Sequence, residues 1–331
     1  MKKYPKVPRY DHPVVNTEIF EHANTILLEK FDGSNCSFIL YDSKFDSQYS
    51  QDILNLNPEE NDLIIFSKNK LQGLESTMDK HVRGTYGDLI DYLVNIVDKS
   101  AIKKLYDEYG LLQFFVEYMR EQSICEYSSD IPLAIGFDVY NISESITHDN
   151  LSTPDNKYKE KFIHFLKYSQ SKKMFNKINI EPANTVPFEW PLSNPDSFEI
   201  PYSKYGDIKA EGVIIRNDTL ETRYKLRSEF FKEIHKKSKC LSVSNIETEE
   251  DILDRFCPEM RIRKMINKMI LDEGRELDKS LNNELYQRVN EDMWSEEYHE
   301  IMRINAEINP SKLNPMLAKR CIKVIEKMQN E

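Results

Sequence analysis

This sequence of 331 residues contains no long apolar run, no visible signal-peptide pattern and no pattern of paired cysteines. No stretch approaches the roughly 20 apolar residues that a membrane-spanning helix needs, so we expect no membrane partner. The first residues are basic, but no apolar segment follows them, and we therefore expect no signal peptide. The five cysteines are odd in number and scattered. This argues against a disulfide framework or a cysteine zinc site, and it fits a reducing cytoplasm.

An excess of positive charge is also missing, because the formal net charge is −11. This value is not typical of a nucleic-acid-binding protein, although net charge says little about local patches. One patch lies between Arg223 and Lys239, where seven cations stand against two anions. A solvated helix face is the ordinary explanation of such an island. The apolar content of 40% and the charged content of 31% are those of a globular chain long enough for two domains.

Short strand-like runs fill the first two thirds of the chain. Residues 25–28 and 36–41 are predicted to form a hairpin, with Gly33 and Ser34 at the bend. Further strands are expected at residues 63–66, 111–118, 131–140, 212–216 and 222–227. Other predictions are a loop at 42–61, a helix or helix pair at 84–109 and a helix at 157–175. Strands joined by hairpins rather than by regular crossovers favour a mostly antiparallel α+β core.

The pattern changes after about residue 243. Only one glycine, Gly274, remains, and apolar residues recur at helical spacing, as in Ile262, Ile266 and Ile270. Such a stripe is most simply the core-facing side of a helix. We therefore predict two domains, an α+β domain of residues 1–242 and an all-α domain of residues 243–331.

The stretch from Glu29 to Asn35, with the sequence EKFDGSN, is the first candidate site. It places Lys30 at a strand end, close to the carboxylate of Asp32 and to a small residue, Gly33. A lysine amine attacks only when it is unprotonated, and desolvation or neighbouring cations favour that form. A surface turn with a solvated lysine is the more frequent explanation of such a tetrapeptide, so the remainder of the chain must decide.

Four more short elements follow in order, each on a predicted strand or at its end. They are Phe114-Phe115-Val116-Glu117, Gly136-Phe137-Asp138-Val139-Tyr140, Ala210-Glu211-Gly212-Val213-Ile214-Ile215 and Tyr224-Lys225-Leu226-Arg227. Together with Lys-x-Asp-Gly, this ordered set resembles the covalent nucleotidyltransferase superfamily of polynucleotide ligases and messenger-RNA capping enzymes. The resemblance implies an antiparallel-sheet nucleotidyltransferase domain of the ATP-grasp-like ligase type over residues 1–242. It also implies ATP and Mg²⁺ (or Mn²⁺) as cofactors.

Transfer of a nucleotide to a lysine requires a neutralised α-phosphate and an in-line leaving group. Lys225 and Arg227 alternate by two on one strand, so both point to the same face and can bind that phosphate. The ordinary alternative is the outer face of an amphipathic strand. Glu211 begins an apolar strand, where it would be a metal ligand or, more plainly, a solvated edge charge.

The resemblance assigns further residues to the nucleotide. Glu117 would accept a ribose hydroxyl or hold metal, and an aromatic neighbour would stack on the base. Strand alternation favours Phe115 over Phe114 for stacking, although both are more commonly core residues. Asp138, between Phe137 and Val139, is either a further site residue or simply the cap of a turn. The resemblance also assigns nucleotide contacts to Glu29, Gly33 and Lys68.

Two features resemble the RNA ligases related to the phage RNA-editing and nick-sealing type. Asn35 lies five residues after Lys30, where that branch uses an asparagine in sealing, and the C-terminal segment is helical rather than a β-barrel. Asp32 departs from the branch, which commonly has histidine there. Arg227 stands at the second motif lysine, keeps the charge and cannot be deprotonated.

These features predict a cytoplasmic ATP-dependent RNA ligase of RNA repair, which joins 3′-OH and 5′-phosphate RNA ends through lysyl-AMP and an adenylylated 5′ end. The predicted partner is RNA, without an obligate protein partner. A minimal ATP-dependent DNA ligase or a capping guanylyltransferase is the alternative enzyme. A nucleic-acid-binding module with a degenerate ligase fold is the non-enzymatic alternative.

Overall fold

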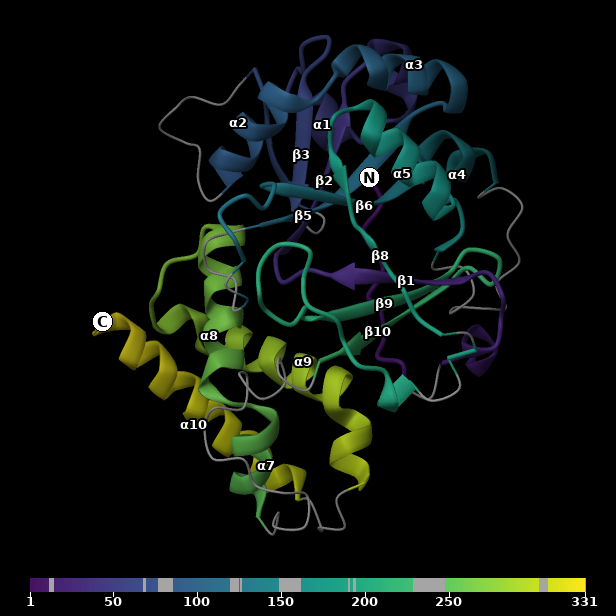
Figure 1. Cartoon of the computed structure of the whole chain (residues 1–331). Coiled ribbons are helices and arrows are strands. Elements are labelled where there is room, and N and C mark those ends of the chain that lie inside the picture. Colours follow the sequence, from purple (N-terminus) through teal and green to yellow (C-terminus); the bar gives the residue numbers. More distant parts are fainter. Residues whose placement is uncertain are drawn as a thin grey trace. The chain divides into compact units, whose positions relative to one another are not determined.

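The computed structural model describes residues 1–331 except 12–14, 68–69, 77–85, 120–124, 126, 149–161, 190, 193–194, 229–247, 304–308 and 331. The contacts between residues divide the chain between Arg227 and Ser228, apart from a short stretch at Asp11 that groups with the second unit. The domain boundary predicted near residue 243 lies outside the described residues. Figure 1 shows the first unit in purple to green and the second in green to yellow.

The first unit contains two sheets. The large sheet has the strand order β4-β3-β2-β5-β6-β7, in which only β6 and β7 pair in parallel. Its strands are β2 (Ser34–Leu40), β3 (Leu63–Ser67), β4 (Lys70–Leu74), β5 (Leu112–Tyr118), β6 (Ala134–Asn141) and β7 (Glu181–Pro182). The small sheet is antiparallel throughout and has the order β10-β9-β1-β8. Its strands are β1 (Thr25–Lys30), β8 (Thr185–Val186), β9 (Gly212–Asn217) and β10 (Thr222–Arg227).

The predicted hairpin of the first two strands is wrong, although both strands form. β1 pairs with β8 and β9, whereas β2 pairs with β3 and β5. The connection of residues 31–33 therefore leads from the small sheet to the large one. Gly33 is needed there because a Cβ atom would lie 2.6 Å from the carbonyl oxygen of Tyr118 on β5. The Lys-x-Asp-Gly motif therefore lies where the chain crosses from the small sheet to the large sheet.

Helices cover one face of the large sheet (Figure 1). The helices of this unit are α1 (Gln51–Leu54), α2 (Gly87–Ile96), α3 (Lys99–Tyr109), α4 (Ile142–His148) and α5 (Tyr168–Lys177), with 3-10 turns η1 (Thr17–Phe20), η2 (Ser43–Gln48) and η5 (Pro195–Ser197). Phe114 of β5 stacks on Phe38 of β2 at 5.3 Å and meets Phe175 of α5 at 6.0 Å. The aromatic side chains of this face thus form the core between strands and helices.

The predicted helix pair between residues 84 and 109 is confirmed as α2 and α3, and Gly110 ends α3 at a φ of 81°. Two predictions need correction. The segment 42–61 contains η2 and α1, because Phe45 and Ile53 are buried there at helical turns. Of the helix predicted at 157–175, residues 157–161 lie outside the described residues, and in the described part the helix begins at Tyr168. Before it, Leu166 donates its backbone N–H to Val139 of β6 at 2.9 Å, which holds this stretch against the sheet.

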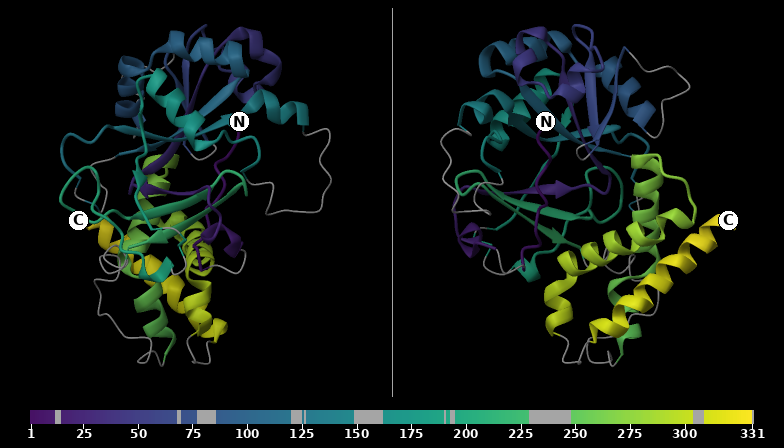
Figure 2. Two further views of the ribbon diagram at one scale, coloured as in Figure 1. Left: turned by 45° about the vertical axis from the view of Figure 1, so that its right-hand side comes forward. Right: turned by 180° about the vertical axis from the view of Figure 1, so that it is seen from behind.

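The described part of the second unit is helical, as predicted. It comprises α7 (Glu249–Phe256), α8 (Glu259–Asn267), the π-helical turn η7 (Lys268–Asp272), the 3-10 turn η8 (Lys279–Leu281), α9 (Asn282–Arg303) and α10 (Pro310–Gln329). The last helix packs against α8 and α9 (Figure 2). Ile262 and Ile266 are fully buried, which confirms the core-facing stripe. Among the described helices, none combines the length and apolar character needed to cross a membrane.

Candidate active site

Lys30 and Glu211 meet because of strand register. Lys30, the last residue of β1, pairs with Gly212, the first residue of β9. Glu211 precedes that glycine, and its Oε2 forms an ion pair with the Nζ of Lys30. The side chain of Glu211 is 2% exposed and that of Lys30 is 22% exposed. The carboxylate is therefore buried, while the amine remains within reach of a substrate.

Arg227 approaches the same carboxylate from the other side. It pairs with Gly212 across β9 and β10, and its Nε lies 3.4 Å from the Oε1 of Glu211. Gly212 permits this approach, because a Cβ atom there would lie 2.1 Å from the carbonyl oxygen of Leu226. The glycine of the Glu-Gly motif therefore brings β10 close to β9. The buried Glu211 lies between two cations from neighbouring strands.

Lys225 lies two residues before Arg227 on β10, so strand alternation gives both side chains the same face. Lys225 is buried, and its position opposite Ile214 lies further along β9 from Glu211. The ordinary alternative, in which Lys225 and Arg227 form the solvent-facing side of an amphipathic strand, does not fit the burial of Lys225. The face instead carries a row of three cations, since Arg223 occupies the next alternate position.

The turn after Lys30 is held by two side chains. The backbone N–H of Gly33 donates to the Oε1 of Glu117 at 3.1 Å, and that of Asp32 donates to the Tyr127 hydroxyl at 2.8 Å. Asp32 is itself buried. Glu117, which the resemblance assigns to the ribose or to metal, thus anchors the turn that follows Lys30. Tyr127 was missed, because nothing in its sequence context connects it to this turn.

The structure separates Glu29 from the Lys30 cluster. Adjacent strand residues point to opposite faces, and the carboxylate of Glu29 accepts hydrogen bonds from Ser203 Oγ at 2.5 Å and from the Lys204 N–H at 3.2 Å. It is buried on that side of the small sheet. These contacts give Glu29 a role in fixing the loop before β9, away from the face that carries Lys30.

Asn35 and Phe115 lie on the face of the large sheet that carries Glu117. Asn35 pairs directly with Glu117 across β2 and β5. Phe115 is 0% exposed, with its ring 5.2 Å from Tyr4 and 5.7 Å from Phe165. The predicted stacking of a base on Phe115 therefore has no exposed ring surface to use. Lys68 lies outside the described residues.

The residues present fit a hard divalent cation with few protein ligands. Within the described ranges, no group of three or more His, Cys, Asp or Glu side chains could hold a metal ion. Mg²⁺ is commonly bound by one or two carboxylates, with substrate phosphates and waters as its other ligands. Glu211 offers one such carboxylate beside Lys30. Glu117 is the second predicted ligand, and its Oε1 accepts the hydrogen bond from Gly33.

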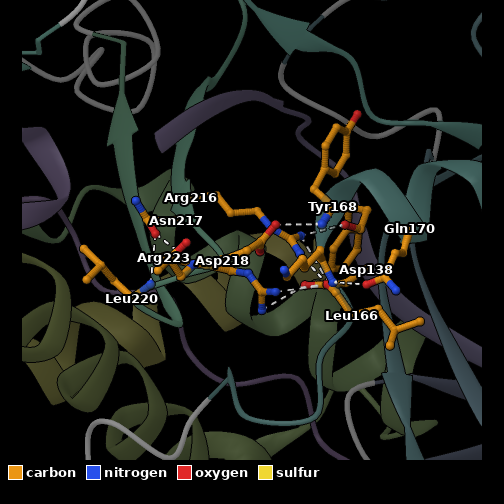
Figure 3. Close-up of polar contacts among 12 residues, drawn as sticks. Asp138, Leu166, Tyr168, Gln170, Arg216, Asn217, Asp218, Leu220 and Arg223 are labelled. Carbon is orange, nitrogen blue, oxygen red and sulfur yellow. Dashed lines mark hydrogen bonds and ion pairs between the residues drawn. The ribbon is translucent and has the colours of Figure 1, made fainter. Parts of the chain in front are cut away.

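A buried ion network joins the two sheets (Figure 3). Asp138 of β6 is 0% exposed and is contacted by three side chains. These contacts come from Arg223 Nη1 at 2.9 Å and Nη2 at 3.2 Å, from Arg216 Nη1 at 3.3 Å and from the Tyr4 hydroxyl at 2.9 Å. Arg216 of β9 also binds Asp218 at 2.6 Å. Burial, followed by the charge of Arg216, lowers the pKa of Arg223 from its usual value. The alternative that Asp138 simply caps a turn is wrong, since it is the central carboxylate of this network.

Cys125 lies close to the turn, but its environment makes it unreactive. Burial raises the pKa of its thiol to about 12, and the negative charge of Asp32 acts in the same direction. The neutral thiol is therefore the form present at ordinary pH.

No protein-family model and no curated protein matches the sequence. Among solved structures, the chain is similar to Naegleria gruberi RNA ligase. For the complex with PPi, the TM-score is 0.47 and the identity is 13%, over 72% of this chain and 58% of the ligase. For a mutant with ATP and Mn, the TM-score is 0.46 and the identity 11%, over 71% and 58%. This chain thus spans less than two thirds of the length of that ligase.

Proposed function

We propose that the chain is an ATP-dependent RNA ligase that works through a lysyl-AMP at Lys30. The observation that carries the proposal is the convergence of Lys30, Glu211 and Arg227, which come from three of the five ordered motifs. Lys30 and Arg227 end the strands β1 and β10, and Glu211 directly precedes β9, the strand between them. Nucleotidyl transfer to lysine needs an accessible amine, a carboxylate that can hold the metal ion and a cation that can bind the phosphates, and these three residues supply them. An ordinary surface turn would not bury Glu211.

In the first step, the unprotonated amine of Lys30 attacks the α-phosphate of ATP. A P–N bond forms and the amine nitrogen loses one proton to solvent, while the bond from the α-phosphorus to the oxygen bridging the α- and β-phosphates breaks and pyrophosphate leaves. Lys225 and Arg227 bind the phosphate oxygens and stabilise the charge that develops on them. Glu211 would hold Mg²⁺ or Mn²⁺, which supplies further neutralisation of the phosphates.

In the second step, AMP moves from Lys30 to the 5′-phosphate of an RNA end. In the third, a 3′-hydroxyl attacks that phosphate, and AMP leaves as the phosphodiester bond forms. Asn35 acts in these sealing steps, from its position beside Glu117. The helical C-terminal region binds RNA, since all five motifs of the nucleotide site come before it in the chain.

Labelled ATP tests the first step. The protein is incubated with labelled ATP or labelled GTP and Mg²⁺, then run on a denaturing gel, with Lys30→Ala alongside. Lys172→Ala is the matched control, because Lys172 is an exposed lysine of α5. We expect a covalent label from ATP that only Lys30→Ala abolishes. A label from GTP alone would indicate a guanylyltransferase, and no label would leave the non-enzymatic alternative.

A comparison of sealing rates on RNA and DNA ends tests whether the substrate is RNA. RNA and DNA differ at the ribose 2′-hydroxyl and in helix geometry. Loss of one hydrogen bond to that hydroxyl would lower the sealing rate by about one to two orders of magnitude. The rate of sealing is measured on matched nicks that end in a 3′ ribonucleotide or a 3′ deoxyribonucleotide, with the intact protein and with Asn35→Ala. We expect the intact protein to seal the ribonucleotide nick faster. Equal sealing of both nicks by the intact protein would favour the DNA ligase instead.

A further inference from the structure

The first ten residues connect the two sheets. At one end, Lys2 exchanges two hydrogen bonds with the buried side chain of Gln113 on β5, at 2.9 and 3.1 Å. Tyr4 then donates its hydroxyl proton to Asp138 on β6. Its ring lies among aromatic rings of the large sheet and its surroundings, including Phe115 and Phe137. The purple start of the chain runs from the large sheet to the small sheet in Figure 2.

At the other end, this segment binds the backbone of Lys225. Arg9 forms a parallel bridge with Lys225, which is a residue of the first strand in the order of the small sheet. The N–H of Lys225 donates to the carbonyl of Pro8 at 2.9 Å, and the N–H of Tyr10 donates to the carbonyl of Lys225 at 3.1 Å. The outward backbone groups of one β10 residue are thus both satisfied by residues 8–10. That residue carries a proposed phosphate contact.

The sequence of the segment favours this extended course. Pro5 and Pro8 fix their own φ angles near −65° and restrict the residues before them to extended conformations. Proline has no N–H to donate, but its carbonyl remains an acceptor, and Pro8 uses it for Lys225. The segment therefore reaches β10 already extended, which reduces the entropy lost when the bridge forms.

We infer that residues 8–10 position Lys225 for adenylyl transfer, with Tyr4 anchoring the segment to the large sheet. The inference rests on the proposed function, in which Lys225 binds the α-phosphate. Side-chain direction on a strand follows the backbone, so a displaced Lys225 backbone moves its ammonium group. A displacement of about 1 Å in a reacting arrangement can cost about 100-fold in rate. Residues 8–10 are thus positioning residues that act through Lys225.

One pair of variants at a single position isolates the hydrogen bond. Tyr10→Pro removes both the ring and the N–H that binds Lys225, whereas Tyr10→Ala removes only the ring. The maximal rate of lysyl-AMP formation is measured at saturating ATP in both. We expect a rate about tenfold lower in Tyr10→Pro than in Tyr10→Ala, the fold-change that about 1.4 kcal/mol produces. Equal rates would overturn the inference.

A double-mutant cycle separates positioning from a general loss of stability. If residues 8–10 act through Lys225, then Tyr10→Pro should add no further loss to Lys225→Ala, relative to Tyr10→Ala in the same background. Additive losses would overturn the inference. Tyr4→Phe is a second variant for the case that Tyr10→Pro does not fold. Tyr4→Phe keeps the ring but removes the hydroxyl, and we expect it to lower the rate of lysyl-AMP formation about threefold. This loss should not occur when Tyr4→Phe is made in the Lys225→Ala background.

Hydrogen exchange keeps this inference distinct from the proposed function. The exchange of the Lys225 amide is followed in Tyr10→Pro and Tyr10→Ala without ATP. Faster exchange in Tyr10→Pro than in Tyr10→Ala would support the contact between Tyr10 and Lys225. If the unsubstituted protein formed no lysyl-AMP, that result would contradict the proposed function but not this contact. Equal exchange in the two variants would show that the Tyr10 N–H does not hold β10.

Discussion

The ion pair between Lys30 and Glu211 joins a lysine side chain that is 22% exposed to a glutamate side chain that is only 2% exposed. The two residues are distant in the sequence and adjacent in space because β1 and β9 pair with Lys30 opposite Gly212. Glu211 is the buried member of the pair, so a change of its carboxylate should mainly alter the surroundings of the Lys30 amine.

Glu211→Gln is expected to lower the rate of lysyl-AMP formation at least about 100-fold. The amide keeps the shape of the side chain but loses the charge that faces Lys30 and that would hold the proposed metal ion. Loss of one such electrostatic contact costs about 10²–10³ in rate. Glu199→Gln is the matched control, because Glu199 is a largely exposed carboxylate paired with Lys209. Labelling of Glu211→Gln at the control rate would contradict the assigned role.

Gly212→Ala is expected to lower both stability and labelling. Its Cβ would meet the carbonyl oxygen of Leu226 at 2.1 Å, so β9 and β10 must separate. Overpacking of this kind costs about 1–3 kcal/mol, which urea unfolding measures. Gly274→Ala is the comparison, since it has no neighbour within 4 Å but a φ of 63°. That variant should lose stability through its backbone and keep the labelling rate.

Asp138→Asn is expected to destabilise the protein by about 3–5 kcal/mol. It removes the charge that faces two buried guanidinium groups, those of Arg216 and Arg223, and an uncompensated buried charge carries that penalty. Asp107→Asn should change stability by less than about 1 kcal/mol, since the Asp107–Lys44 pair is exposed. Equal urea midpoints for the two variants would contradict the role given to the network.

The stability of the protein should fall as the pH rises from 8 to 10. Burial raises the pKa of Cys257 to about 12, so between about pH 8.5 and 12 the folded state keeps a proton that the unfolded state has lost. Stability from this thiol is present below pH 8.5 and decreases above it, by about 2 kcal/mol at pH 10. Cys257→Ala should have a smaller fall in urea midpoint over that range. An identical fall would contradict the assignment to Cys257.

The positions of the strands and the order of the motifs can be predicted from the sequence, because each strand and each motif is a pattern of neighbouring residues. Alternation on β10 correctly gave Lys225 and Arg227 one face. The meeting of Lys30 with Glu211 was implied only by resemblance, since strand register between distant segments has no local signal. The hairpin prediction failed for the same reason, because a small residue between two strands does not reveal which sheet each strand joins.

Phe115 and Asp138 show what local patterns omit. Alternation places Phe115 on the face of Glu117, but it does not indicate that Tyr4 and Phe165 cover that ring. Asp138 receives its arginines from positions 78 and 85 residues away. A carboxylate between two apolar residues resembles a turn cap until those distant partners are known. Local sequence patterns therefore do not predict which side chains are buried by segments that are distant in the chain.

The position of β1 between β8 and β9 also affects how the protein is made. Thr25 at the start of β1 lies 192 residues before its hydrogen-bond partner Asn217. Contacts of such long sequence separation form slowly, because the intervening chain must first be ordered. During synthesis, the strand that carries Lys30 can gain its β9 neighbour only after residue 217 has emerged. Lys30 itself can meet its carboxylate partner only after Glu211 has been made.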